Sequence, residues 1–511
     1  MSAQFAMVIS RASTVPAGHG EGETPAAETA DLLAQAAAGP GFWEDLLGEL
    51  RREGLIAELL ADGVIATAVA QAEHGHQLDR ALTAEVTAMC VIVAALFPDQ
   101  GYDMVLARTF AMPGLPVKPG TVTPSGPALS KARVLLGEQV MRRIFELDAA
   151  RTDLELGIGA AWHEMETTAI DGTTIELFND AELAEAFGVP TGGTKPKLRI
   201  AAHVRTASRR WIAAAVGGYL DGENMLADEL EGSFTGGILN LADRGFFSMD
   251  RWIRFSADGA QLVWRVKNGA KSVPFKTLKA LPDGSELVLL HESGSMLGKR
   301  RRDSGDKTLP RLPGTVARLV SFTVTARTAH RARTSVIKVL TTLLDHQEFP
   351  AREIAALYAE RWQAEIAFLH LKKTVKGTGR VLRGRSPALA RQEAWALLLV
   401  HNMTATIGAR AAGLAAVDPH LIPFTAVLSL IRSHITADTC CPHCGKRPAS
   451  GNDPIALLAS QILDHPAHRD RPARTSGRTP FQRQNWHTEE VTYTTTIVPS
   501  NLPRADIHPG S

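Results

Sequence analysis

Two aspartates in the middle of the chain have surroundings that indicate metal or acid chemistry. Asp171 follows an apolar run that ends at Ile170, and Asp243 follows a second apolar run that ends at Ala242. We expect each run to be a buried strand that delivers its carboxylate to the end of the strand, where backbone can approach a ligand. Either acid taken alone can also be explained as a turn former or a helix cap.

A third acid, Glu365, lies in a helical pattern together with other polar residues. Tyr358, Arg361, Glu365 and Lys372 fall on one face of the predicted helix, within an arc of roughly 60° at about 100° per residue. A solvated face with an ion pair between Arg361 and Glu365 is the alternative explanation. Lys372 lies about 10 Å beyond Glu365 along the axis, so it cannot share a metal ion with that acid. It is placed to hold a DNA phosphate, as Arg361 is one turn earlier, with Tyr358 adding a hydroxyl or stacking surface.

This arrangement resembles the DDE transposases of the insertion-element-four family. The family signature is Y-x2-R-x3-E-x6-K, and four residues match it without a gap: Tyr358, Arg361, Glu365 and Lys372. The segments around Asp171 and Asp243 look like the first and second acidic motifs of the family. The resemblance extends over about residues 42–410, and it implies a bacterial insertion-sequence transposase whose catalytic acids are Asp171, Asp243 and Glu365.

Electrostatics explains why such a site would need cations. Three carboxylates within about 5 Å would repel each other by roughly 3 kcal/mol per pair at an effective dielectric constant of about 20. Two Mg²⁺ or Mn²⁺ ions about 4 Å apart would relieve this repulsion, activate a water molecule and stabilise the leaving 3′-oxygen. The liberated 3′-hydroxyl could then attack target DNA at the same site.

The expected function is therefore DNA transposition. The protein would bind the terminal inverted repeats of its insertion sequence, cleave the DNA ends and join them to target DNA, and the family implies a homodimer that holds both ends. Two alternatives remain open: a non-catalytic DNA-binding protein derived from a transposase, and a ribonuclease-H-fold nuclease without strand transfer. Metal-dependent nicking separates the first alternative, and a joining assay separates the second.

Other residues give weaker signals. Lys373 and Arg244 are further candidates for DNA contact, and Trp264 could stack on a displaced base or pack in the core. The basic run 299–302 could grip DNA or form a solvated loop. Three cysteines resemble half of a zinc knuckle: Cys440, Cys441 and Cys444. A second pair of zinc ligands is not evident, although His434, His465 or His468 could supply it, so a zinc ion is possible but disfavoured.

The elements that must position these residues follow an α/β pattern. Short strand-like runs begin at Thr167, and three strands, a helix and a fourth strand precede Asp243. This is the order in which a ribonuclease-H-like core begins. We therefore expect a ribonuclease-H-like catalytic core with a β-rich insertion at about residues 252–341, preceded by a helical N-terminal domain. A long helix that carries Glu365 should begin at Pro350.

Four regions are expected along the chain. They are a disordered leader (1–40), a helical DNA-binding domain (41–148), the catalytic domain with its insertion (149–410), and a C-terminal region with the cysteine cluster and a flexible tail (411–511).

Composition is consistent with a soluble multidomain protein. The chain has 511 residues, a formal net charge of +1 and four cysteines. A protein that is basic everywhere is excluded, but local basic patches decide phosphate contact. The sequence shows no membrane-spanning segment and no secretory signal, so we expect a cytoplasmic protein that is associated with the nucleoid when bound to DNA.

Overall fold

A computed structural model describes most of the chain between residues 63 and 437 and one C-terminal segment. The described residues are 63–72, 81–112, 115, 117–118, 120–153, 158, 161–268, 273–327, 332–414, 418–437 and 492–498. The expected leader and the candidate zinc ligands Cys440, Cys441 and Cys444 lie outside these ranges.

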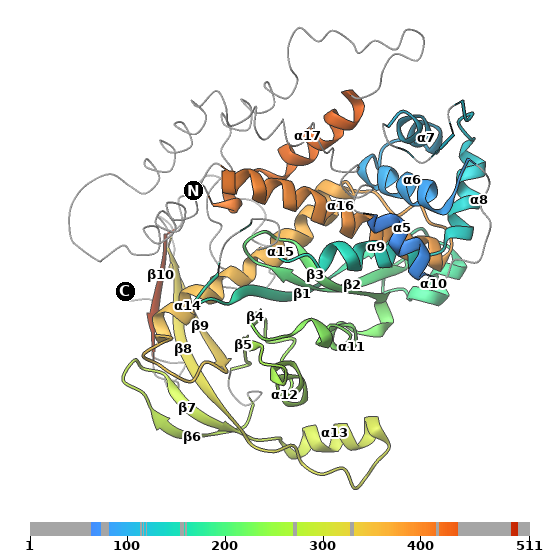
Figure 1. Cartoon of the computed structure of the whole chain (residues 1–511). Coiled ribbons are helices and arrows are strands. Elements are labelled where there is room, and N and C mark those ends of the chain that lie inside the picture. The colour runs from blue at the N-terminus through green and yellow to red at the C-terminus, as the bar shows by residue number, and fades with distance from the viewer. Residues whose placement is uncertain are drawn as a thin grey trace.

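Ten strands of the described residues form one sheet in the order β3-β2-β1-β4-β5-β9-β8-β7-β6, with β10 paired to β8 (Figure 1). The strands are β1 (Glu166–Glu176), β2 (Lys197–Arg205), β3 (Trp211–Gly218), β4 (Ile238–Ala242), β5 (Gln261–Arg265), β6 (Phe275–Ala280), β7 (Glu286–Leu290), β8 (Thr315–Arg327), β9 (Ala332–Thr341) and β10 (Thr492–Ile497). Strand β1 runs antiparallel to β2 and parallel to β4, and β4 runs parallel to β5. The fold is therefore mixed α/β with a large sheet, as predicted.

Helices cover both faces of the β1–β5 part of the sheet (Figure 1). The helices are α5 (Val64–Gln71), α6 (Ala84–Leu96), α7 (Tyr102–Phe110), α8 (Gly126–Leu136), α9 (Gln139–Ala149), α10 (Ala181–Phe187), α11 (Glu223–Asp228), α12 (Met249–Ser256), α13 (Gly294–Ser304), α14 (Ala351–Leu357), α15 (Trp362–Leu369), α16 (Pro387–Leu414) and α17 (Phe424–Ala437). Successive side chains of a strand point to opposite faces, so β1 contributes to two cores. Ala169 packs in the core shared with α6, α9 and α16, whereas Ile170 packs in the core with α11 and α12.

Buried polar side chains join the N-terminal helices to the sheet. Asn402 on α16 accepts a hydrogen bond from Trp211 N on β3 over 2.7 Å and donates to Asp148 Oδ2 on α9 over 2.9 Å. The guanidinium of Arg210 donates to the carbonyl of Asp148 over 2.9 Å. Because each of these buried groups has a partner, helices α9 and α16 have one defined position against the sheet.

The basic run 299–302 lies in a helix and not in the loop that the charge pattern suggested. Helix α13 spans Gly294–Ser304, and Ser293 caps its start by accepting a hydrogen bond from Met296 N. The buried acid Glu292 pairs with Arg300 over 2.9 Å, so part of the positive charge is used to anchor the helix. In Figure 1 this helix projects from the sheet at the bottom of the molecule.

One segment of the region that we expected to be a flexible tail forms a strand. Residues 492–497 form β10, which pairs antiparallel with the second half of β8. Threonine, tyrosine and isoleucine fill this segment, and these residue types favour strands.

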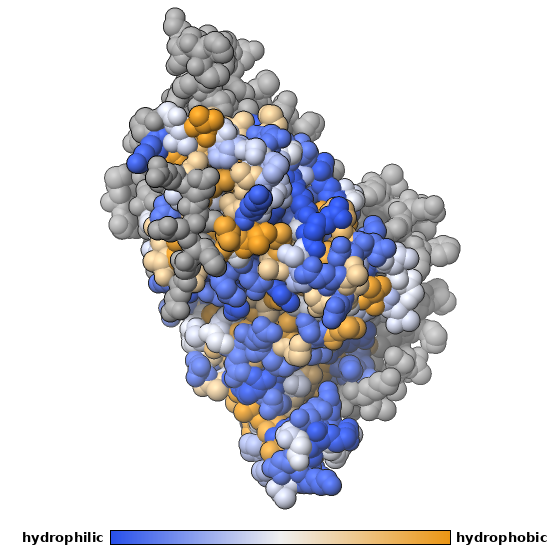
Figure 2. All heavy atoms as spheres, turned by 90° about the vertical axis from the view of Figure 1, so that its right-hand side faces the viewer, coloured by the Kyte–Doolittle hydropathy of each residue, from blue (hydrophilic) through white to orange (hydrophobic). Residues whose placement is uncertain are grey.

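The surface shows no dominant apolar region on the face drawn in Figure 2. That face is mostly hydrophilic, with apolar side chains in small groups. Among the residues that the structure describes, no helix is long and apolar enough to cross a membrane.

Candidate active site

The register of two parallel strands places the first two acids next to each other. Ile170 of β1 pairs with Ala242 of β4, and this is the last pair between the two strands. Asp171 and Asp243 are the residues that follow, so they lie next to each other on neighbouring strands. Asp171 does not lie at the end of its own strand, as we had expected, because β1 continues to Glu176 beside β2. It lies instead where its parallel neighbour β4 ends. The pairing between β1 and β4 therefore ends at both carboxylates.

Asp171 is half-buried and lies in a charged neighbourhood. Burial raises the pKa of Asp171 to about 7, Arg361 and a hydrogen bond from Gly172 N oppose that rise, and the carboxylates of Glu365 and Glu223 add to it. The backbone bond from Gly172 N to Asp171 Oδ1 measures 2.8 Å. An acid with this pKa binds a cation in competition with protons near neutral pH.

Arg361 connects the first acid with the third. Its Nη2 donates to Glu365 Oε1 over 2.7 Å, and the Arg361 guanidinium also interacts with Asp171. Glu365 lies on α15, which contacts β1, and Arg361 lies in the 3₁₀ segment just before this helix. The predicted helix therefore brings its acid to the strand that carries Asp171.

Tyr358 is buried and faces the sheet, which corrects our expectation of a DNA-facing side chain. It is 5% exposed, and its hydroxyl donates to the carbonyl of Ala242 over 3.2 Å. The helix that we expected to be regular is α-helical over residues 351–357, 3₁₀ over 358–361, α-helical over 362–369 and π-helical over 370–375. These changes of winding rotate the side chains away from a single 3.6-residue face. Tyr358 therefore supports the end of β4, immediately before Asp243.

The charge of Asp243 is also offset by an arginine. Arg265 Nη1 lies 3.4 Å from Asp243 Oδ1, across from β4 on the neighbouring strand β5. We did not identify Arg265 from the sequence, although its place on the strand after the second acid was a usable signal. The two arginines thus occupy positions at which a cation neutralises the acids.

Glu223 is a second residue that sequence reasoning missed. It begins α11, and its carboxylate lies against Gly172, where a Cβ atom would approach Glu223 Oε1 to 2.3 Å. Only glycine leaves room for the carboxylate in this position. Nothing local in the sequence pairs these two residues.

The donor set fits a divalent metal ion in its chemistry. Asp171, Asp243 and Glu365 supply carboxylate oxygens, which are the ligands that Mg²⁺ and Mn²⁺ prefer. Within the described ranges, no three acidic, histidine or cysteine side chains are arranged so that they could already hold one metal ion. In this arrangement two of the three acids are paired with arginines, and a cation would replace or join these partners.

The remaining candidates for DNA contact differ in their exposure. Arg244 and Lys373 are exposed, and Lys372 is half-buried in the π-helical segment. Trp264 is fully buried, and its Nε1 donates to Asn240 Oδ1 over 3.0 Å within a group of aromatic rings that includes Trp252. The expectation that Trp264 stacks on a base is therefore wrong for this fold, because its ring has no free face. Core packing, the alternative, is what the structure shows.

Comparisons with known proteins match two families. Residues 52–146 match the family described as insertion element 4 transposase N-terminal, and residues 162–403 match the family described as transposase DDE domain. The second range contains all three candidate acids.

Two individual proteins are also similar. The chain is 27% identical over 333 residues to the transposase InsG for insertion sequence element IS4 of Escherichia coli (strain K12), which covers 63% of this chain and 69% of the relative. A solved cryo-EM structure of a piggyBac transposase synaptic complex with hairpin DNA aligns with 78% of this chain and 81% of that chain, at 11% identity and a TM-score of 0.37.

Proposed function

This chain belongs to the insertion element 4 family of DDE transposases and is a transposase, and from that premise we propose how it acts. It binds the terminal inverted repeats of its insertion sequence, hydrolyses phosphodiester bonds at the DNA ends and joins these ends to target DNA. Asp171, Asp243 and Glu365 form the catalytic centre. The observation that carries this assignment is the β1–β4 register, which sets Asp171 beside Asp243 under the helix of Glu365.

The proposed core is ribonuclease-H-like. Strands β1 to β5 have the order β3-β2-β1-β4-β5, with β2 antiparallel to its neighbours and with β1, β4 and β5 parallel. We assign residues 149–410 to this catalytic domain and residues 41–148 to a DNA-binding helical domain. The insertion expected at about 252–341 begins after β5 in this assignment, because β5 pairs with β4 and belongs to the core. The region 411–511 would complete the chain.

We propose that the three acids hold two Mg²⁺ or Mn²⁺ ions. When bound, such ions activate the attacking water and stabilise the leaving 3′-oxygen. The residues of the chain perform the remaining tasks. Arg361 holds Glu365 in place and offsets the negative charge near Asp171, and Tyr358 fixes the end of β4 from which Asp243 extends.

DNA is the proposed partner, and exposed cations beside the acids suit its backbone. Arg244 follows Asp243 directly, and Lys372 and Lys373 follow Glu365 on the same continuous helix. We propose that these three side chains contact phosphates near the cleaved bond. The protein would act as a homodimer in the complex that holds both ends, in the cytoplasm at the nucleoid.

The decisive experiment measures DNA joining. Purified protein is incubated with Mg²⁺ or Mn²⁺ and a duplex that carries the terminal sequence of its own element, beside Glu365→Gln and Glu360→Gln variants. Glu360 is the matched control because it lies on the same helical segment, five residues earlier. We expect nicked and joined products that require metal, that disappear in Glu365→Gln and that persist in Glu360→Gln.

Other outcomes would point elsewhere. Tight binding of the end without nicking would replace the proposal by a non-catalytic DNA-binding function. Nicking without any joined product would indicate a nuclease of the same fold. Joining that survives Glu365→Gln would remove Glu365 from the catalytic centre.

A further inference from the structure

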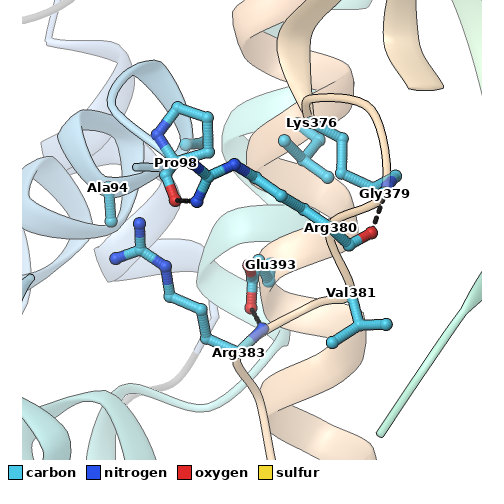
Figure 3. A pocket seen from close by; sticks show the side chains of 10 residues that line it. Ala94, Pro98, Lys376, Gly379, Arg380, Val381, Arg383 and Glu393 are labelled. Atoms are coloured by element: carbon cyan, nitrogen blue, oxygen red, sulfur yellow. Dashed lines mark hydrogen bonds between the residues drawn. The ribbon is translucent and has the colours of Figure 1, made fainter. Parts of the chain in front are cut away.

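A basic cavity lies between the N-terminal helices and the segment that follows the catalytic helix. Its volume is about 310 Å³, and it is bounded by the end of α6 and by residues 376–383, which lead from the π-helical segment to α16 (Figure 3). Three cationic side chains line it: Lys376, Arg380 and Arg383. Arg383 also lines a neighbouring, more open hollow of about 400 Å³ over residues 98–102.

The acid in the wall of this cavity offsets only part of the charge of the three cations, because it interacts with Arg383 and Lys376 but is a single carboxylate. Among the described residues that line the cavity, Glu393 is the one acid. Its Oε2 accepts hydrogen bonds from two backbone groups, Arg383 N over 2.8 Å and Gly384 N over 3.1 Å. The carboxylate therefore fixes the turn at residues 383–384, and the hydrogen bonds that hold it come from the backbone (Figure 3).

Both arginines are held in place with donors to spare. Arg380 Nη1 donates to the carbonyl of Pro98 over 2.9 Å, and Arg383 Nη2 donates to the carbonyl of Phe97 over 3.1 Å. A guanidinium has five N–H groups in a fixed fork, so one hydrogen bond to a carbonyl orients the group and leaves other N–H groups to donate. Lys376 is held in the same way by the carbonyls of Gly377 and Arg380.

Like charges are crowded here. Burial lowers the pKa of Lys376, and the nearby cations Lys372 and Arg380 lower it further, whereas the carboxylates of Glu176 and Glu393 counter this. An anion placed among these side chains would relieve both the repulsion and the cost of burying the ammonium group. Two arginine forks and a lysine point charge are the groups that proteins use to bind phosphate.

We propose that this cavity binds a phosphate of the DNA backbone in the transposon end, away from the phosphate that is cleaved. This inference rests on the proposed function. Lys376 lies eleven residues after Glu365, beyond the end of α15 and the π-helical segment 370–375. The bound phosphate therefore lies some base steps away from the cleaved one, toward the N-terminal helices. The site also joins the end of α6 to the catalytic helix, so DNA would contact both parts of the chain at once.

A purely structural role makes a different prediction. If Arg380 and Arg383 serve only to satisfy the carbonyls of Pro98 and Phe97, just after α6, their removal lowers the melting temperature and leaves the response to the DNA backbone unchanged. A test must therefore measure which phosphate each side chain senses, and not only whether binding weakens.

The experiment is a methylphosphonate scan, in which one phosphate at a time in the end duplex is made neutral. Binding is measured with the full chain in Ca²⁺, to prevent cleavage, for the wild type and for Lys376→Ala, Arg380→Ala and Arg385→Ala. Arg385 is the matched control because it is an exposed arginine of the same segment whose guanidinium lies 3.7 Å from the Phe178 ring centre and does not line the cavity.

We expect one or two adjacent positions at which the neutral linkage weakens wild-type binding about tenfold, as loss of a charged hydrogen bond would. At these positions the effect should vanish in Lys376→Ala and Arg380→Ala, because their phosphate contact is already lost, and should persist in Arg385→Ala. If every position keeps its full effect in both cavity variants, the inference is overturned, whatever the melting temperatures do.

Two further outcomes separate this inference from neighbouring ones. In one outcome, inorganic phosphate raises the melting temperature of the wild type but not that of Arg380→Ala, and at no position of the duplex does the effect of the neutral linkage depend on the cavity residues. This outcome would assign the cavity to a free phosphate and overturn the DNA contact. If the wild type joins ends while the effect of the neutral linkage is the same in the cavity variants at every position, the proposed function stands and this inference fails. If the wild type binds no end duplex, both fail.

Discussion

Arg361 Nη2 lies 2.7 Å from Glu365 Oε1, so the third acid is held by an arginine of its own helix. The same guanidinium interacts with Asp171 on β1. One cation therefore lies between two carboxylates that a metal ion would otherwise bring together. This arrangement explains how the chain can fold with acids gathered at one edge of the sheet before any metal ion is bound, because repulsion between them is partly offset.

The first prediction concerns the cost of a partly buried acid. Asp171→Asn should raise the melting temperature of the metal-free protein at pH 8, because an uncharged amide avoids burial of charge and repulsion from Glu365 and Glu223. The folded pKa of Asp171, about 7, lies above its ordinary value of 3.8, so stability falls as pH rises between these values. Above pH 7 the full loss is present, on the order of 4 kcal/mol. Differential scanning fluorimetry in a chelator measures the gain.

Metal removal gives the complementary half of that prediction. Mn²⁺ should raise the melting temperature of the wild type by mass action and should not raise that of Asp171→Asn. Asp180→Asn is the control, since this half-buried carboxylate caps α10 through backbone hydrogen bonds that asparagine can also accept. A metal response that is equal in all three proteins would contradict the assignment of Asp171 as a ligand.

The second prediction tests whether Tyr358 supports the sheet or contacts DNA. Tyr358→Phe removes the hydrogen bond to Ala242 O and should lower stability by about 1 kcal/mol. We expect slower joining with unchanged affinity for the end duplex, because Asp243 loses part of its support while the buried ring touches no DNA. Filter binding and single-turnover joining measure the two quantities, with Tyr219→Phe as the control. A loss of affinity for the end duplex as large as that of Lys372→Ala would indicate that Tyr358 contacts DNA.

Sequence reasoning located the acids because their signals are local. An apolar run that ends in an aspartate and a helical pattern around Glu365 are each visible within about ten residues. The parallel pairing of β1 with β4, which sets Asp171 beside Asp243, comes from the structure. The same reasoning failed where winding changes along a helix. Tyr358 lies in the 3₁₀ segment before α15 and faces the sheet, and a fixed period of 3.6 residues cannot anticipate this.

Long-range partners were also beyond sequence reasoning. Glu223 reaches Gly172 from α11, and this contact has no signature in the spacing of residues. Arg265 reaches Asp243 from β5, and its place on the strand after the second acid was the one signal for this contact. Strand β10 likewise depends on the free edge of β8, which only the assembled sheet defines. Burial of Trp264 follows from the aromatic rings of α12 that surround it.

The third prediction tests that burial. Trp264→Ala should destabilise the protein by about 3–5 kcal/mol, because it leaves a cavity among Trp252, Phe255 and Phe247. Trp264→Phe should cost less but still leaves the side-chain oxygen of Asn240 without its donor. Chemical denaturation measures both changes. Loss of joining by Trp264→Phe at unchanged stability would instead support a direct role at the DNA.

The last prediction is a loss of stability in acid that arises from buried histidines. Burial lowers the pKa of His203 to about 3, and burial together with Arg209 lowers the pKa of His370 to about 3. The unfolded chain takes up these protons below about pH 6.5, whereas the folded chain resists them until about pH 3. The free energy of unfolding is therefore undiminished above pH 6.5. It falls as pH falls, by about 2 kcal/mol per histidine at pH 5. His370→Phe, which keeps a ring stacked on Phe424, should flatten the fall of melting temperature between pH 6.5 and 5, and the exposed His291→Gln should not. Equal slopes for wild type and His370→Phe would mean that His370 is protonated in the folded protein.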